Sequence, residues 1–303
     1  MTGFQRRLQL GCSWSIVSAL VKEIATITVI GKDRTGLIAR ITGFLFAQRA
    51  NIEEMEEQVS RGLFSMNLQA SWGARDFDRA VVERGLRQLA NELGMEVKVR
   101  FAEKGRRQRM AMFVTKEPHC AETVLCAIRA GAIAADCVVI ISNRTDLKSQ
   151  AADWRIPFLV VNWNDRRAAE KAVLKAVERY EVDFMALARF MKILSPNFVW
   201  RFKNKIINIH PSLLPAFAGA SAYRQAYEKG VQIVGVTAHF VTTNLDEGPI
   251  IWQEALRVHP NESLESIVAR GQRLESRALL RAIQLFLKKR LDVYWGKVHL
   301  PSR

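Results

Sequence analysis

The chain has 303 residues, of which 49% are hydrophobic and 25% charged, and its formal net charge is +15. This length allows two domains, and the composition is that of a globular protein rather than a disordered or fibrous one. The positive charge favours an anionic partner, but no Lys/Arg run with interleaved aromatics indicates nucleic-acid binding, and the apolar stretch at 6–21 is too short and polar to span a bilayer. We therefore expect neither a nucleic-acid nor a membrane partner.

The cysteines and the first residues bear on the location of the protein and on metal binding. The four cysteines form no C-x-x-C pair, and no His spacing is typical of a zinc site: Cys12, Cys120, Cys126 and Cys137. Reduced thiols, a cytoplasmic location and no bound metal are the expectation. Residues 1–22 lack a clear cleavage site, and we interpret them as an N-terminal extension outside the fold.

The segment 23–104 follows the order strand, helix, strand, strand, helix, strand. Alternating apolar residues predict strands, and the turn after Ile30 has helix-start signals, with Thr35 as the expected N-cap. The second helix is expected to turn Val81 and Val82 inward. The strands are expected at 23–30, 52–60, 63–72 and 95–101, and the second helix at 76–93. This βαββαβ order is the ferredoxin-like arrangement.

A basic linker at 105–109 separates this domain from a second one at 110–303. There, strands and helices alternate, which predicts an α/β fold with a doubly wound, mostly parallel sheet. We expect strands at 110–115, 137–142, 158–161, 184–188, 206–209, 232–242 and 249–258, and helices at 120–130, 146–154, 166–180, 196–202, 221–229 and 263–289.

Two polar residues stand where the strand expected at 206–209 runs into a turn. Asn208 and His210 are two residues apart, so on an extended strand they face the same way. In open α/β sheets, ligands bind at the carboxyl ends of the strands. A carboxamide beside an imidazole suits the binding of a carbonyl group, although the same two residues would also serve as caps of a turn.

A third polar residue, Asp246, lies in the loop between the last two expected strands, just before Gly248 and Pro249. An amide, an imidazole and a carboxylate together suit attack on a carbonyl carbon, because the amide stabilises the oxyanion while the other two move a proton. No G-x-S-x-G motif occurs, and Cys120 and Cys126 fall on an expected helix. We therefore expect direct attack without a covalent intermediate.

The first domain resembles the ACT family of small-molecule regulatory modules. The resemblance is carried by the loop Asp33, Arg34, Thr35, Gly36 with Leu37 and Ile38, and by Asn51-Ile52. It implies an amino-acid effector at this loop and edge-to-edge pairing into a homo-oligomer, either a dimer or a tetramer. The alternative is that Gly36 only permits the turn and the domain only dimerises.

The second domain resembles the formyltransferases that use 10-formyltetrahydrofolate, through the runs 208–215 (N-I-H-P-S-L-L-P) and 245–250 (L-D-E-G-P-I). The resemblance implies that Asn208, His210 and Asp246 are catalytic, with the folate as substrate and no permanently bound cofactor. It also implies substrate-binding roles for Met191, Lys192, Ile193, Leu194, His239, Leu245 and Gly248. The alternatives are a buried structural role for His239 and core packing for Met191, Ile193 and Leu194.

One branch of this family fits best. The segment 114–120 has no glycine-rich phosphate loop, and K-E-x-H-C at 116–120 with A-F-x-G-A at 216–220 resembles the formyltetrahydrofolate deformylases. This resemblance implies hydrolysis to formate and tetrahydrofolate, which supplies formate for purine synthesis and balances one-carbon pools. Pro211 and Leu213 follow the transferases instead, so formyl transfer to an amine stays an alternative. A silent ligand-binding regulator is the third possibility.

Overall fold

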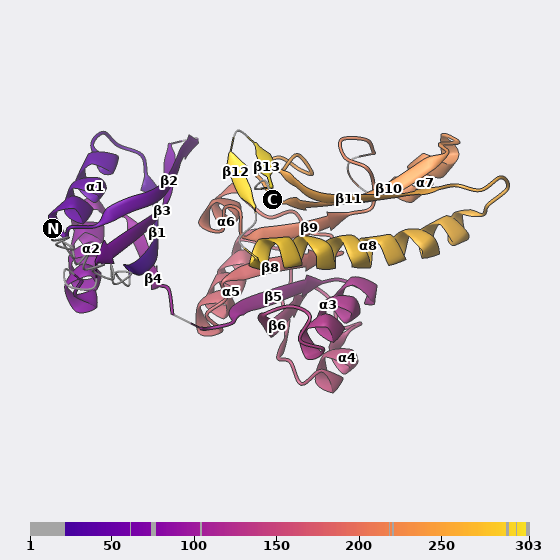
Figure 1. Ribbon diagram of the computed structural model, residues 1–303, viewed down its shortest axis with the longest axis horizontal. Helices are drawn as coiled ribbons and strands as arrows, with labels where there is room; N and C mark the ends of the chain where they lie inside the picture. The colour runs from indigo at the N-terminus through magenta and orange to yellow at the C-terminus, as the bar shows by residue number, and fades with distance from the viewer. Residues whose placement is uncertain are drawn as a thin grey trace, which may run out of the picture. The chain divides into compact units, whose positions relative to one another are not determined.

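The computed structural model describes residues 22–60, 62–73, 77–103, 105–217, 219, 221–288, 291–294 and 296–300 (Figure 1). The chain divides after Glu103 into two units, 1–103 and 104–303, and the described part of each has its own hydrophobic core. The extension assigned to 1–22 lies outside the described residues, except for Lys22. The limits 23–104 and 110–303 remain our proposal. The linker assigned to 105–109 is shorter than expected, because strand β5 already begins at Gln108.

The first unit has the βαββαβ order expected from the sequence. Its four strands form one antiparallel sheet in the order β2-β3-β1-β4. Alternate residues of the central strand β1, such as Ile27 and Val29, are buried against the two helices, as period-two alternation requires. The elements are β1 (Lys22–Lys32), α1 (Leu37–Ala47), β2 (Asn51–Ser60), β3 (Leu63–Gly73), α2 (Arg79–Leu93) and β4 (Glu96–Phe101).

Both helix starts in this unit differ from the expectation. Gly36, not Thr35, is the N-cap of α1, with φ of 86° and no capping side chain, because glycine takes this left-handed conformation without strain. Helix α2 starts later than expected, because the Asp78 carboxylate accepts hydrogen bonds from the backbone N–H groups of Ala80 and Val81. Val81 then faces solvent and is 38% exposed, while Val82 is buried.

The second unit contains a seven-stranded sheet in the order β11-β10-β9-β8-β5-β6-β7. Strands β5 to β9 are parallel, and β10 and β11 are antiparallel additions at one edge. The doubly wound, mostly parallel sheet is confirmed. The strands are β5 (Gln108–Val114), β6 (Ala135–Ser142), β7 (Phe158–Val160), β8 (Phe184–Ala188), β9 (Ile206–His210), β10 (Ile233–Phe240) and β11 (Ile250–Arg257).

Helices cover both faces of this sheet. Along β5, Met110 and Met112 pack into one core with α3 and α8, while Ala111 and Phe113 pack into the other with α5 and α6. Figure 1 shows α8 running along the sheet, where it contacts β9, β10 and β11. The helices are α3 (His119–Arg129), α4 (Lys148–Asp153), α5 (Arg166–Arg179), α6 (Pro196–Arg201), α7 (Ala222–Glu228) and α8 (Leu264–Leu287).

Helix α8 closes the core that it shares with α3 and begins where the sequence indicates. The Ser263 hydroxyl caps it by accepting a hydrogen bond from the backbone N–H of Ser266. Its inner face is fully buried at Ala278, Leu279 and Ile283, and its outer face is charged. Among the described residues, no helix combines the length and the apolar composition needed to cross a bilayer.

A short hairpin near the C-terminus was not expected. Strands β12 (Asp292–Tyr294) and β13 (Lys297–His299) pair with each other and form a separate two-stranded sheet. Three residues are too few to show an alternating apolar pattern, so the sequence carries no periodic signal for them.

Truncating α8 tests this packing. Leu279→Ala removes a fully buried side chain from the core between α8 and α3. It should lower the free energy of unfolding of the second unit by about 2–5 kcal/mol. Urea unfolding followed by tryptophan fluorescence measures it. Arg273→Ala, on the exposed face of the same helix, should stay within about 0.5 kcal/mol of the parent. Equal losses in the two variants would contradict the assignment of the buried face.

Candidate active site

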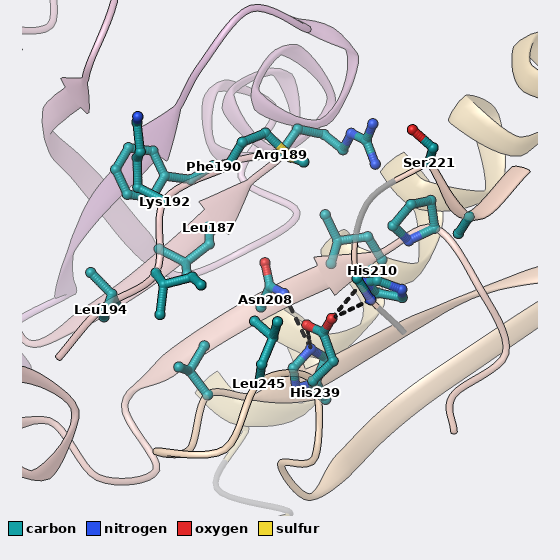
Figure 2. A pocket seen from close by; sticks show the side chains of 18 of the residues that line it. Leu187, Arg189, Phe190, Lys192, Leu194, Asn208, His210, Ser221, His239 and Leu245 are labelled. Carbon is teal, nitrogen blue, oxygen red and sulfur yellow. Dashed lines mark hydrogen bonds and ion pairs between the residues drawn. The ribbon is translucent and has the colours of Figure 1, made fainter. Parts of the chain in front are cut away.

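The polar residues expected to act together surround a cavity at the carboxyl end of β9. The cavity has a volume of about 500 Å³. Its walls come from the ends of β8, β9 and β10, from α7, from the loop between β10 and β11, and from α8 (Figure 2). Asn208, His210 and Asp246 all line it, so residues from β9 and from a loop some 36 positions later share one pocket.

Asn208 faces His239 across the β9–β10 pair, where the two residues are register partners. The Nδ1–H of His239 donates to the Phe240 carbonyl oxygen at 2.9 Å, so its Nε2 accepts from the Asn208 Nδ2 amide at 3.1 Å. Burial lowers the pKa of His239, which keeps the ring neutral. His239 therefore fixes the carboxamide of Asn208 with one Nδ2 hydrogen still free to donate.

His210 and Asp246 form a buried pair. The His210 Nε2–H donates to the Phe217 carbonyl oxygen at 3.1 Å, and its Nδ1 lies 3.3 Å from Asp246 Oδ2. A carbonyl oxygen only accepts, so Nε2 carries a proton, and a hydrogen bond across the Nδ1–Oδ2 gap needs one more. A proton on Nδ1 would make this contact an imidazolium–carboxylate pair, and an imidazole beside a carboxylate is an arrangement that can move a proton.

The position of Asp246 is fixed by its backbone and by one N–H group. Asp246 has a φ of 57°, in the left-handed region, and its Oδ2 accepts a hydrogen bond from the Gly219 backbone N–H at 3.1 Å. With Oδ2 engaged by Gly219 and His210, Oδ1 is directed to the other side, 3.8 Å from His239 Nε2. This second oxygen is the one available to a molecule in the cavity.

Gly248, expected to bind substrate, does not line the cavity. A Cβ at this position would lie 1.6 Å from the Phe240 carbonyl oxygen and 3.3 Å from His239 Nδ1. Only glycine lets the loop pass this close to the end of β10. Gly248 thus sits behind His239 and shapes the loop that carries Asp246.

The segment after β8 forms an apolar rim on the cavity. Met191 and Ile193 are 56% and 59% exposed, and Leu245 on the opposite loop is 56% exposed. Exposed apolar side chains gathered around a pocket indicate a ligand surface rather than core packing. Lys192 also lines the cavity, whereas Leu194 is buried and belongs to the core as well.

Comparison with known proteins identifies the chain. Residues 108–283 match the formyl transferase family and residues 23–100 the ACT domain family. The formyltetrahydrofolate deformylase of Synechocystis sp. is 37% identical over 89% of this chain and 95% of its own length. The crystal structure of the Pseudomonas syringae formyltetrahydrofolate deformylase superposes with a TM-score of 0.63 and 30% identity, covering 92% of this chain and 94% of that one. The chain belongs to the formyltetrahydrofolate deformylase family.

The resemblances inferred from the sequence are thus confirmed, and the protein is assigned to a family of hydrolases that convert 10-formyltetrahydrofolate to formate and tetrahydrofolate. A glycinamide ribonucleotide transformylase from Symbiobacterium toebii also superposes, with a TM-score of 0.63 and 33% identity. It covers only 66% of this chain and 96% of its own. That coverage is about the size of the second unit, which carries the active site.

The sequence missed one cluster in this deformylase-family member. Arg189, directly after β8, lines the cavity, and Glu275 of α8 lies 3.5 Å from its Nε. His119 binds the same carboxylate from a position 156 residues away, so no local pattern joins them. The run K-E-x-H-C was the only signal, and neither Glu117 nor His119 lines the cavity.

The ACT loop residues lie between β1 and α1. The Asp33 backbone N–H donates to the Gly62 carbonyl oxygen at 2.9 Å, and the Arg34 guanidinium donates to the Leu93 carbonyl oxygen at the end of α2. Thr35 and Gly36 form the turn into α1. The loop is exposed and tied at two points, and its regulatory role remains a prediction.

The neutral state of His239 has a consequence for pH dependence. The unfolded chain takes up a proton on this ring below the ordinary pKa near 6.5, whereas the folded chain resists it, so folding stability falls as the pH falls. His239→Gln should show a smaller loss of melting temperature between about pH 7.5 and about pH 5.5 than the parent. The exposed His259→Gln variant is the control. An unchanged pH dependence in His239→Gln would contradict a neutral, buried His239.

Proposed function

We propose that the cavity at the end of β9 hydrolyses 10-formyltetrahydrofolate with water as the acceptor, and that Asn208, His210 and Asp246 carry the reaction. The observation that supports this most directly is the buried His210–Asp246 pair, with Nδ1 and Oδ2 3.3 Å apart, beside a carboxamide with one free N–H. Such a set can polarise a carbonyl and accept a proton without a covalent intermediate or a metal ion.

The folate would bind along the apolar rim. Met191, Ile193 and Leu245 offer exposed apolar surface that suits flat aromatic rings, and Lys192 offers a positive charge to a carboxylate tail. Figure 2 shows Lys192 and Leu194 on one side of Asn208 and His210 on the other, so the rings would lie on the first side and the formyl group near Asn208. No permanently bound cofactor is required.

The first chemical step forms the carbon–oxygen bond. The free Nδ2–H of Asn208 donates to the formyl oxygen and stabilises its negative charge as water attacks the carbon. In this scheme His210 carries a proton on both ring nitrogens and Asp246 is ionised, so that Oδ1 takes the proton that the water loses. The imidazolium of His210 then faces the growing negative charge of the intermediate.

The second step breaks the bond between the formyl carbon and N10. N10 leaves as an amine and takes the proton held by Asp246. The remaining hydroxyl proton of formic acid goes to solvent. The products are formate, tetrahydrofolate and one released proton, which balances the addition of water.

Asp246→Asn tests this role. The amide cannot accept the proton of water, so formate release should fall by at least about a hundredfold, while the dissociation constant of a non-hydrolysable folate stays within about threefold. A coupled formate assay and fluorescence titration measure the two quantities. Asp153→Asn, an exposed change on α4, is the matched control. A near-parental rate in Asp246→Asn would refute the assigned role.

The same assay decides between water and an amine as acceptor. With no amine present, the proposed hydrolase releases one formate for each 10-formyltetrahydrofolate consumed. An amine transferase would release none until an acceptor is added, and a silent regulator would release none at all.

We also propose a metabolic place for the reaction. In the cytoplasm, the released formate would serve purine synthesis and the reaction would balance the one-carbon pools. Deleting the gene should slow growth without purines, and added formate should restore it. Growth that is unaffected by deletion, or that formate does not restore, would contradict this proposal.

We propose that the ACT unit regulates the enzyme. An amino acid would bind near Asp33, Arg34, Thr35 and Gly36, and edge pairing of the sheets would make a homodimer or a homotetramer. Strands β2 and β4 form the two edges of the sheet within the first unit, and sheet edges are where such pairing takes place.

A further inference from the structure

Arg189 extends into the active-site cavity from the end of β8. Its backbone has a φ of 62°, in the left-handed region that residues other than glycine seldom adopt. Figure 2 shows its guanidinium directed toward Ser221, on the side of Asn208 away from Lys192 and Leu194. The cavity therefore has a second charged end, opposite the rim that we assign to the folate rings.

The buried carboxylate of Glu275 forms an ion pair with Arg189. Glu275 of α8 is fully buried and lies 3.5 Å from Arg189 Nε through Oε2. Its Oε2 is 3.0 Å from His119 Nε2, and its Oε1 accepts a hydrogen bond from the Tyr223 hydroxyl at 2.9 Å. A buried carboxylate needs such partners, and Arg189 supplies the compensating charge.

The guanidinium is not saturated by this contact. The Nε–H of Arg189 is buried and makes no hydrogen bond, and within the described ranges no residue accepts a hydrogen bond from the terminal nitrogens. The side chain is 23% exposed, toward the cavity that it lines. A planar guanidinium with free N–H groups is suited to bind a carboxylate through two parallel hydrogen bonds.

The same cluster is poorly suited to a metal ion. Ligand atoms of His119, Cys120 and Glu275 lie within 4.8 Å of one another. Burial raises the pKa of the Cys120 thiol, so it stays protonated, and Arg189 already neutralises Glu275. A cation there would face the guanidinium at close range.

We propose that Arg189 binds the formate anion that the reaction produces. The formyl group of the substrate is neutral, and a carboxylate appears only after the C–N10 bond has broken and formic acid has lost its proton, so the charge of Arg189 favours the product over the substrate. This inference rests on the proposed function. It assigns the two ends of the cavity to different products, the folate to the apolar rim and formate to Arg189, with Glu275 positioning the guanidinium.

Product inhibition by formate tests it. In Arg189→Gln, the inhibition constant of formate should rise by about tenfold, because a charge-assisted pair is lost, while KM for 10-formyltetrahydrofolate stays within about twofold. Arg189→Lys keeps the charge without the planar fork and should give an intermediate constant. It also decides the question if the Gln variant does not fold. Arg273→Gln, on the exposed face of α8, is the charge-matched control and should leave the constant unchanged.

The outcomes are distinct. A parental enzyme that releases no formate refutes the proposed function itself. If it releases formate, three results overturn the role of Arg189: no inhibition of the parental enzyme by formate, an unchanged inhibition constant in both Arg189 variants, or a rise in KM for the folate in place of the inhibition constant. The last result would assign Arg189 to the folate tail.

Discussion

The active-site cavity is organised around the buried contact between His210 and Asp246. The Phe217 carbonyl oxygen accepts the Nε2–H of His210, and this contact directs Nδ1 toward Asp246 at 3.3 Å. Both side chains are almost fully buried, so solvent and salt screen the interaction between them only weakly. The turn after β9 therefore shapes the cavity, since it supplies the carbonyl oxygen that fixes the imidazole.

The antiparallel edge of the sheet completes the site. Because β10 runs against β9, His239 comes to lie opposite Asn208 and its neutral ring orients the amide. Gly248 lets the loop between β10 and β11 cross the end of β10 at a distance that no other residue permits. The same loop carries Asp246 to His210. If β10 were parallel to β9, the chain would need a crossover connection between them. The loop after β10 would then not return Asp246 to the same place beside His210.

Two charged systems thus share one cavity. We propose that the His210–Asp246 pair moves protons beside Asn208, while the Glu275–Arg189 pair presents a cation at the other end. The chain belongs to the formyltetrahydrofolate deformylase family, and its second unit has the same fold as a transformylase. The acceptor is small and the product anionic, which gives the second pair its proposed use.

The sequence by itself determined the element order of the first unit and of the second as far as α8, and it singled out Asn208, His210 and Asp246 as candidates, because strand alternation, turn residues and strand-end motifs are local signals. Its errors were local as well: Thr35 gave way to Gly36 as the α1 cap, and β12 and β13 were too short to show a period. Only the tertiary structure brought Arg189, His119 and Glu275 together, since no periodic pattern links positions up to 156 residues apart. The protonation of His239 was likewise decided by burial and by its partner across the strand, which are properties of packing and not of the residue itself.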